Sequence, residues 1–100
     1  MTAARRRVGP GDDPAALARG AAAGGAESVL LLLDPALDPL AAATARAALG
    51  PLAAELAPGA RVNMVVPHRD ALPADVEAAA RFLEGARSTT GQALEVSARG

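Results

Sequence analysis

The sequence predicts an α/β fold of the doubly wound type, in which helices cover a sheet of three parallel strands. Two observations support this fold class. Short apolar runs alternate along the chain with longer segments rich in alanine and leucine. The run at 28–33 is continuously apolar, as expected for a strand buried on both faces of a parallel sheet, and 61–66 is a second short run with β-branched residues. Strands that alternate with helices form such sheets through right-handed crossovers.

Residues 1–12 are expected to form a disordered N-terminal tail, followed by a single domain over 13–100. The tail contains a run of three arginines at 5–7 and ends in glycine, proline and aspartate. A short basic run near a terminus is usually solvated, so we assign it no function. An Asp-Pro pair at 13–14 is typical of a helix start and predicts a helix over 15–23.

The next two elements are a strand at about 28–33 and a long helix. A second Asp-Pro pair, at 38–39, repeats the helix-start signal, and residues 40–57 have strong helix propensity. Proline inside a helix removes a hydrogen bond and clashes with the preceding turn. Gly50 and Pro51 therefore predict a kink in this helix or its division into two shorter ones.

The C-terminal part of the chain completes the alternation. A β-branched run predicts a second strand at about 61–66, and apolar residues at three- and four-residue spacing predict a helix over 75–85. A third strand is expected at about 92–97. A sheet of three strands has two open edges, and open strand edges attract partner strands.

Composition excludes several classes of function. The chain is 51% hydrophobic and 21% charged, as in globular proteins. Its net charge of −1, with arginine as its only cation besides one histidine, gives no support for nucleic-acid binding. No cysteine is present, which excludes disulfides and thiolate metal sites. No apolar run approaches the roughly 20 residues that span a membrane, and none follows the arginines as in a secretory signal. We therefore expect no membrane association and a cytoplasmic location.

Three short motifs carry a family resemblance: Ala54-Glu55-Leu56-Ala57-Pro58, Arg61-Val62-Asn63 and Thr90-Gly91-Gln92. In order and approximate spacing, they resemble the C-terminal half of the short-chain dehydrogenase/reductase family. The segment 46–67 resembles that family's active-site helix and sixth strand, and the segment 75–96 resembles its last helix and final strand. The resemblance implies a truncated Rossmann-like three-layer unit that corresponds to the family's last three strands and lacks its nucleotide-binding half.

The same resemblance implies that the chain is not itself a working dehydrogenase. The family uses a tyrosine acid/base and, four residues later, a lysine that lowers the tyrosine's pKa and holds the ribose. The sequence contains neither residue type. One alignment puts Ala42 and Arg46 at these positions, and another puts Asp38 and Ala42 there. Leu33 and Asp34 stand where the family has a serine. We expect no catalytic, cofactor-binding or metal-binding residues, and no cofactor.

The remaining polar residues are interpreted as structural. His68, the only histidine, has no nucleophile near it in the sequence to activate. Asp34 and Asp38 each precede a proline, where aspartate commonly caps a turn or a helix. Asn63 resembles the family's asparagine that supports backbone near the active site. The Thr90-Gly91 pair is interpreted as turn chemistry.

The segments that resemble the family are also those through which its subunits pair. The hypothetical interface residues lie on the two C-terminal helices and are Leu49, Leu52, Leu56, Phe82 and Leu83. The leading hypothesis is a non-catalytic subunit that associates with a full-length short-chain dehydrogenase or with itself. The alternatives are an inactive remnant or fragment of such an enzyme, a small regulatory protein-binding domain and, last, an enzyme completed by a second chain. Marginal stability of the isolated chain, with an unpaired apolar edge at 28–33, is expected to favour association.

Overall fold

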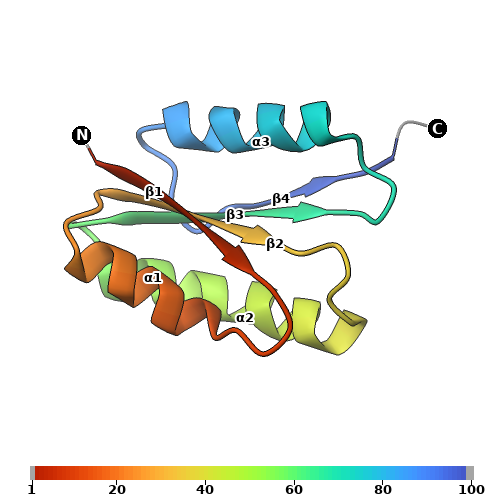
Figure 1. Cartoon of the computed structure of the whole chain (residues 1–100). Coiled ribbons are helices and arrows are strands. Elements are labelled where there is room, and N and C mark those ends of the chain that lie inside the picture. Colours follow the sequence, from red (N-terminus) through yellow and green to blue (C-terminus); the bar gives the residue numbers. More distant parts are fainter. Residues whose placement is uncertain (1, 99–100) are drawn as a thin grey trace.

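The computed structural model describes residues 2–98, which form four strands and three helices. In chain order these are β1 (Ala3–Val8), α1 (Pro14–Ala23), β2 (Ser28–Leu33), α2 (Pro39–Leu56), β3 (Arg61–Pro67), α3 (Pro73–Gly85) and β4 (Ala93–Val96). All strand pairs are parallel, and the strand order is β1-β2-β3-β4. Helices α1 and α2 cover one face of the sheet and α3 covers the other (Figure 1). The predicted three-layer α/β fold and its three sequential parallel strands are confirmed, with one strand added.

The added strand is β1, so the prediction of a disordered tail is wrong for residues 3–8; Met1 lies outside the described residues. β1 pairs with β2 from Ala3 opposite Ser28 to Val8 opposite Leu33. Ala4 and Val8 pack into the core under α1 and α2, and this contact holds the strand on the sheet. The pairing also means that β2 is not the open apolar edge that the sequence led us to expect.

The inner strand β2 is apolar after Ser28 because both of its faces are covered. Val29, Leu31 and Leu33 pack against α1 and α2, whereas Leu30 packs against α3. All four side chains are buried. Since successive side chains of a strand point to opposite faces, only a continuous apolar run fits a strand in this position.

Helix α2 runs unbroken from Pro39 to Leu56, so the predicted division at Gly50 and Pro51 does not occur. Pro51 lies on the exposed side of the helix, as does Ala47, four residues earlier, whose carbonyl loses its helical donor. Water can satisfy that carbonyl, which reduces the cost of the proline. The predicted helix caps are present: Ala15 N–H donates to Asp13 at 3.0 Å, and Ala41 N–H donates to Asp38 at 2.9 Å.

The last crossover differs in hand from the first two. The strands follow one another in a single direction across the sheet, yet α3 lies on the opposite face from α1 and α2 (Figure 1). The connections through α1 and α2 are right-handed, so the connection from β3 through α3 to β4 is left-handed. Because such connections are almost always right-handed, the sequence-based expectation is wrong here. The exception places a helix on a face that would otherwise be bare.

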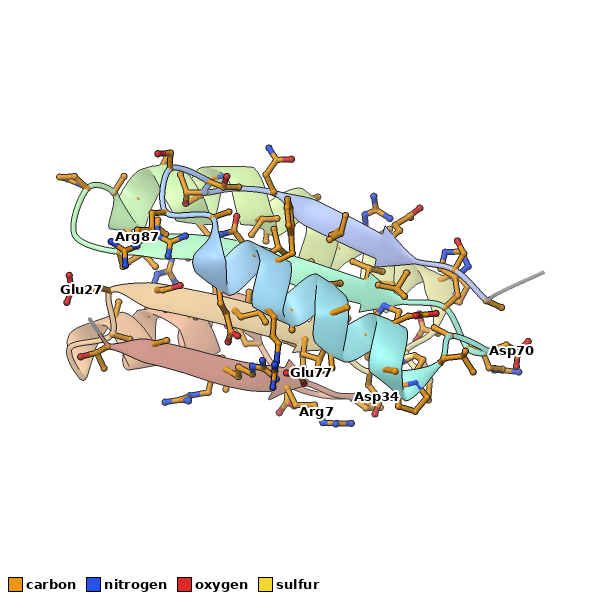
Figure 2. All side chains as sticks on the ribbon, turned by 90° about the horizontal axis from the view of Figure 1, so that it is seen from above. Arg7, Glu27, Asp34, Asp70, Glu77 and Arg87 are labelled. Atoms are coloured by element: carbon orange, nitrogen blue, oxygen red, sulfur yellow. The ribbon has the colours of Figure 1, made fainter. Side chains whose placement is uncertain are left out.

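Arg5 closes the gap that a single helix leaves on that face. α3 lies over the inner strands, and β1 lies beside it (Figure 2). The Arg5 guanidinium donates to Glu77 at 2.8 Å and to Glu84 at 2.7 Å, both on α3. Hydrogen bonds from Arg5 and then from Arg81 lower the pKa of Glu77 to about 2. Ion pairs of Arg5 with Glu77 and Glu84 thus hold β1 against α3, and we call this arrangement the clasp.

This clasp predicts an acid-sensitive contribution to stability. A carboxylate whose pKa is depressed on folding stabilises the protein above its unfolded pKa, and the contribution is lost as the pH falls through the folded pKa. We expect Glu77→Gln to lower the melting temperature slightly at pH 6, because the side chains of Arg5 and Glu77 are 38% and 45% exposed. The difference from the parent chain should shrink between about pH 4.5 and pH 2. Thermal unfolding followed by circular dichroism at several pH values measures this. Glu27→Gln is the control, because Glu27 lies at one end of the molecule, away from Glu77 (Figure 2). An equal effect of both changes would contradict the clasp.

Candidate functional site

The carboxyl ends of parallel strands are where α/β sheets bind ligands, and here they surround a cavity of about 470 Å³. β2 leads into Asp34 and β3 into His68, and both residues line this cavity. α2 contributes Ala42 and Arg46, and β4 contributes Glu95. The structure therefore brings together four of the positions that the family resemblance singled out, Leu33, Asp34, Ala42 and Arg46. The fifth, Asp38, does not line this cavity and caps α2.

Arg46 and Glu95 both line this cavity and form an ion pair with each other. The Arg46 guanidinium donates to the Glu95 carboxylate. This hydrogen bond lowers the pKa of Glu95, with smaller electrostatic contributions from Arg46 and His68. Both side chains are about half exposed, at 40% and 50%, so the pair adds little stability. The effect of the pair is that the guanidinium of Arg46, the only basic group of α2, is bound to the carboxylate of Glu95.

The other side chains in the cavity offer little acid/base chemistry. Ala42 presents a methyl group, and Asp34 accepts a hydrogen bond from Ala36 N–H at 2.8 Å, as predicted for a turn-capping aspartate. His68 is exposed in the loop before α3. Over residues 2–98, no three histidine, cysteine or acidic side chains are grouped so that they could hold a metal ion. The arrangement can bind a polar group but presents no nucleophile beside a base.

The loop after β1 contains a glycine pattern that the sequence reasoning missed. Gly9 and Gly11 follow a strand and precede a helix, which is the setting of the first two glycines of a dinucleotide fingerprint. Gly9 N–H, however, donates to Asp12 at 2.8 Å, and Ala15 N–H is taken by the cap from Asp13. Two carboxylates thus stand where such a loop would receive a pyrophosphate. The pattern is not recognisable in the sequence, because residues 1–12 contain no apolar run that would predict a strand before Gly9.

Asn63 has the structural role that the sequence predicted. Its side chain is buried, at 1% exposure, in β3. The amide donates to the Thr89 carbonyl at 3.0 Å and accepts from Gln92 N–H at 3.0 Å. Gly91, between these partners, has a φ of 77°, a conformation that favours glycine. One buried amide therefore holds the turn that leads into β4.

The hypothetical interface residues divide into two groups. Leu49 and Leu52 are each 3% exposed and Leu83 is 2% exposed, so these three belong to the core and cannot contact a partner in the folded chain. Leu56 is half-buried against that core. Phe82 is 66% exposed on α3 and is the most exposed member of the set. The interface hypothesis is wrong for the three buried leucines.

None of the helices described in residues 2–98 is long and apolar enough to cross a membrane.

A comparison with protein families matches residues 12–96 to a family described as short chain dehydrogenase-like protein. The match begins after β1 and ends with β4, so it covers the sheet except for its first strand. No curated protein and no solved structure matches the chain.

The site predicts that the chain does not bind a nicotinamide dinucleotide. The backbone amides after β1 are engaged by Asp12 and Asp13, and these carboxylates repel a pyrophosphate. Calorimetric titration with NADPH should give no saturable heat. The double variant Ala42→Tyr and Arg46→Lys should likewise show no carbonyl reduction, although it supplies the missing residue types. Saturable binding by the parent chain would overturn this prediction.

The buried amide of Asn63 predicts a measurable loss of stability on truncation. Asn63→Ala leaves the Gln92 N–H without its partner and leaves the Thr89 carbonyl with only the longer bond from Arg61, at 3.3 Å. This should cost about 1–3 kcal/mol in the free energy of unfolding. Urea unfolding measures the change. Gln92→Ala removes an exposed amide from the same turn and should change the free energy by less than about 0.5 kcal/mol. Equal effects of the two variants would show that Asn63 does not hold the turn.

Proposed function

The chain belongs to the family of short chain dehydrogenase-like proteins, and on this premise we propose that it is a non-catalytic subunit that associates with a full-length short-chain dehydrogenase or with a second copy of itself. The docking surface in this proposal is formed by α3 and the open edge of β4. The proposal has two parts, the lack of chemistry and the association, and different observations support each part.

The residues that line the cavity at the strand ends support the proposal that the chain is not catalytic. The family's tyrosine and lysine are replaced by Ala42 and Arg46 in one alignment, and both residues line that cavity. A methyl group cannot transfer a proton. The Arg46 guanidinium is bound to Glu95, and arginine stays protonated at all relevant pH values, so it cannot act as an acid/base. The cavity contains the positions that align with the family's tyrosine and lysine, but it lacks the residue types that the family's reaction needs.

The association rests on one observation, the exposure of Phe82 beside the open edge of β4. Phe82 is the only aromatic residue of the chain and is 66% exposed. Together with Leu94 and Gln92 it lines a hollow of about 390 Å³ next to β4. Burying a phenylalanine side chain contributes about 2 kcal/mol. A partner that pairs with the strand edge would cover the ring at the same time.

The two edges of the sheet differ in how open they are to a copy of the chain. β1 carries three consecutive arginines, and a second copy would bring the same charges against them. β4 carries a single charge, Glu95, which is already paired with Arg46. Like charges on facing strands are destabilising. The β4 edge is therefore the better surface for association with a copy or a close relative.

Association is tested by the mass of the chain in solution as a function of concentration. We expect the parent chain to sediment as a dimer at micromolar concentration, or to co-purify from its host with a full-length dehydrogenase. Phe82→Ser should weaken the complex at least tenfold, because it removes roughly 2 kcal/mol of apolar burial.

Leu40→Ser is the matched control for this experiment. Leu40 is 77% exposed at the start of α2, so the variant removes an exposed apolar side chain away from α3 and β4. It should leave the complex unchanged. A cooperatively unfolding monomer of 9.9 kDa at all concentrations, with no dehydrogenase partner, would contradict the proposal and favour a small regulatory domain. An equal effect of the two variants would show that the interface is not centred on Phe82.

A further inference from the structure

The backbone of β1 is open on the side that faces away from the sheet. The Thr2 carbonyl accepts from Ser28 N–H at 3.2 Å, and the Val8 carbonyl accepts from Asp34 N–H at 2.9 Å. These carbonyls therefore point toward β2. Because the direction alternates along a parallel strand, the N–H and C=O groups of Arg5 and Arg7 point outward. β1 is the terminal strand of the sheet, so no strand of the described chain pairs with them.

Arg6 covers part of this open edge with its own side chain. It alternates with Arg5 along the strand and lies on the same face as Val8, yet its guanidinium reaches round to the Arg5 carbonyl and donates to it at 2.9 Å. That carbonyl is an acceptor that an added strand would use. A charged side chain over an edge acceptor blocks unselective pairing with other strands.

The three arginines of β1 are not equivalent in charge. Arg5 is neutralised by Glu77 and Glu84 on α3. Arg6 and Arg7 form no ion pair within residues 2–98 and are exposed. Two uncompensated cations therefore lie on the open edge of a chain whose net charge is −1.

We propose that the β1 edge is a docking site for an acidic extended segment of a partner protein, and that Arg6 selects this segment by its charge. A carboxylate of the incoming strand pairs with the Arg6 guanidinium and draws it away from the Arg5 carbonyl. The freed carbonyl then accepts an N–H from the added strand, as in other cases of strand addition. A neutral strand has no group that replaces the charge-assisted bond, and a basic strand is repelled.

This inference goes beyond the proposed association, because it uses the opposite edge of the sheet and a partner of different chemistry. Either proposal can fail while the other holds. Phe82 lies on α3 next to β4, whereas Arg6 lies on β1, three strands away in the sheet order. Binding of a peptide to the β1 edge can therefore be measured on the Phe82→Ser variant as well as on the parent chain.

Binding of short fluorescent peptides tests the proposal directly. An extended peptide of about eight residues with alternating glutamate and valine is compared with the same peptide carrying glutamine or lysine in place of glutamate. Anisotropy titrations at low salt should show the acidic peptide binding at least tenfold more tightly than the glutamine peptide, and binding should weaken as salt is added. Hydrogen exchange should slow at the outward amides of Arg5 and Arg7.

Two variants with the same change of charge locate the effect. Arg6→Gln should lower the affinity for the acidic peptide about tenfold and reduce its advantage over the glutamine peptide. Arg87→Gln removes an exposed arginine that lies just after α3, away from Arg7 (Figure 2), and should leave the affinity unchanged. Circular dichroism confirms the fold of each variant.

Four results would overturn the proposal. They are the absence of binding by any peptide, equal binding of the acidic and glutamine peptides, equal effects of Arg6→Gln and Arg87→Gln, and slowed exchange at β4 in place of β1. Unchanged binding of the acidic peptide to Phe82→Ser is the expected result, and it separates this site from the one proposed at α3 and β4.

Discussion

The burial of β2 on all sides is the constraint on which the rest of this structure depends. Its leucines and its valine point alternately to the two faces of the sheet, so each face must be covered by helices. Its two edges must also be paired, and β1 and β3 supply those pairings. A strand of this composition left open on any side would expose apolar surface to water. The left-handed last crossover meets this requirement by placing α3 on the second face.

A single helix cannot cover four strands, and the way in which the gap is filled explains the arginines of β1. On the α3 face, β1 presents Arg5 rather than an apolar side chain, and the guanidinium reaches the two glutamates of α3. The strand therefore needs few apolar contacts of its own. The same run of arginines gives the edge its charge, so one short segment both completes the fold and determines which strands can approach it.

The sequence predicted those elements whose signals are local. β2 and β3 were recognised by their apolar runs, and the helix starts by aspartates that bond to amides two or three residues away. β1 was missed because the glutamates that hold Arg5 lie more than seventy residues away in the sequence. The pairing of Arg46 with Glu95 is equally nonlocal. In α2, alanines surround the leucines on every side, so the periodicity could not show that Leu49 and Leu52 face inward.

The clasp between Arg5 and α3 has a consequence for the order in which the chain is made. Domains begin to fold as they emerge from the ribosome, with the N-terminal part first. β1 is synthesised before every other element, but its pairing strand follows about 25 residues later, and the glutamates that hold Arg5 follow 72 and 79 residues after it. The glutamates that hold Arg5 are therefore made well after β2, the strand with which β1 pairs. In the meantime, the three arginines disfavour pairing of β1 with the same strand of another chain, because like charges on facing strands repel.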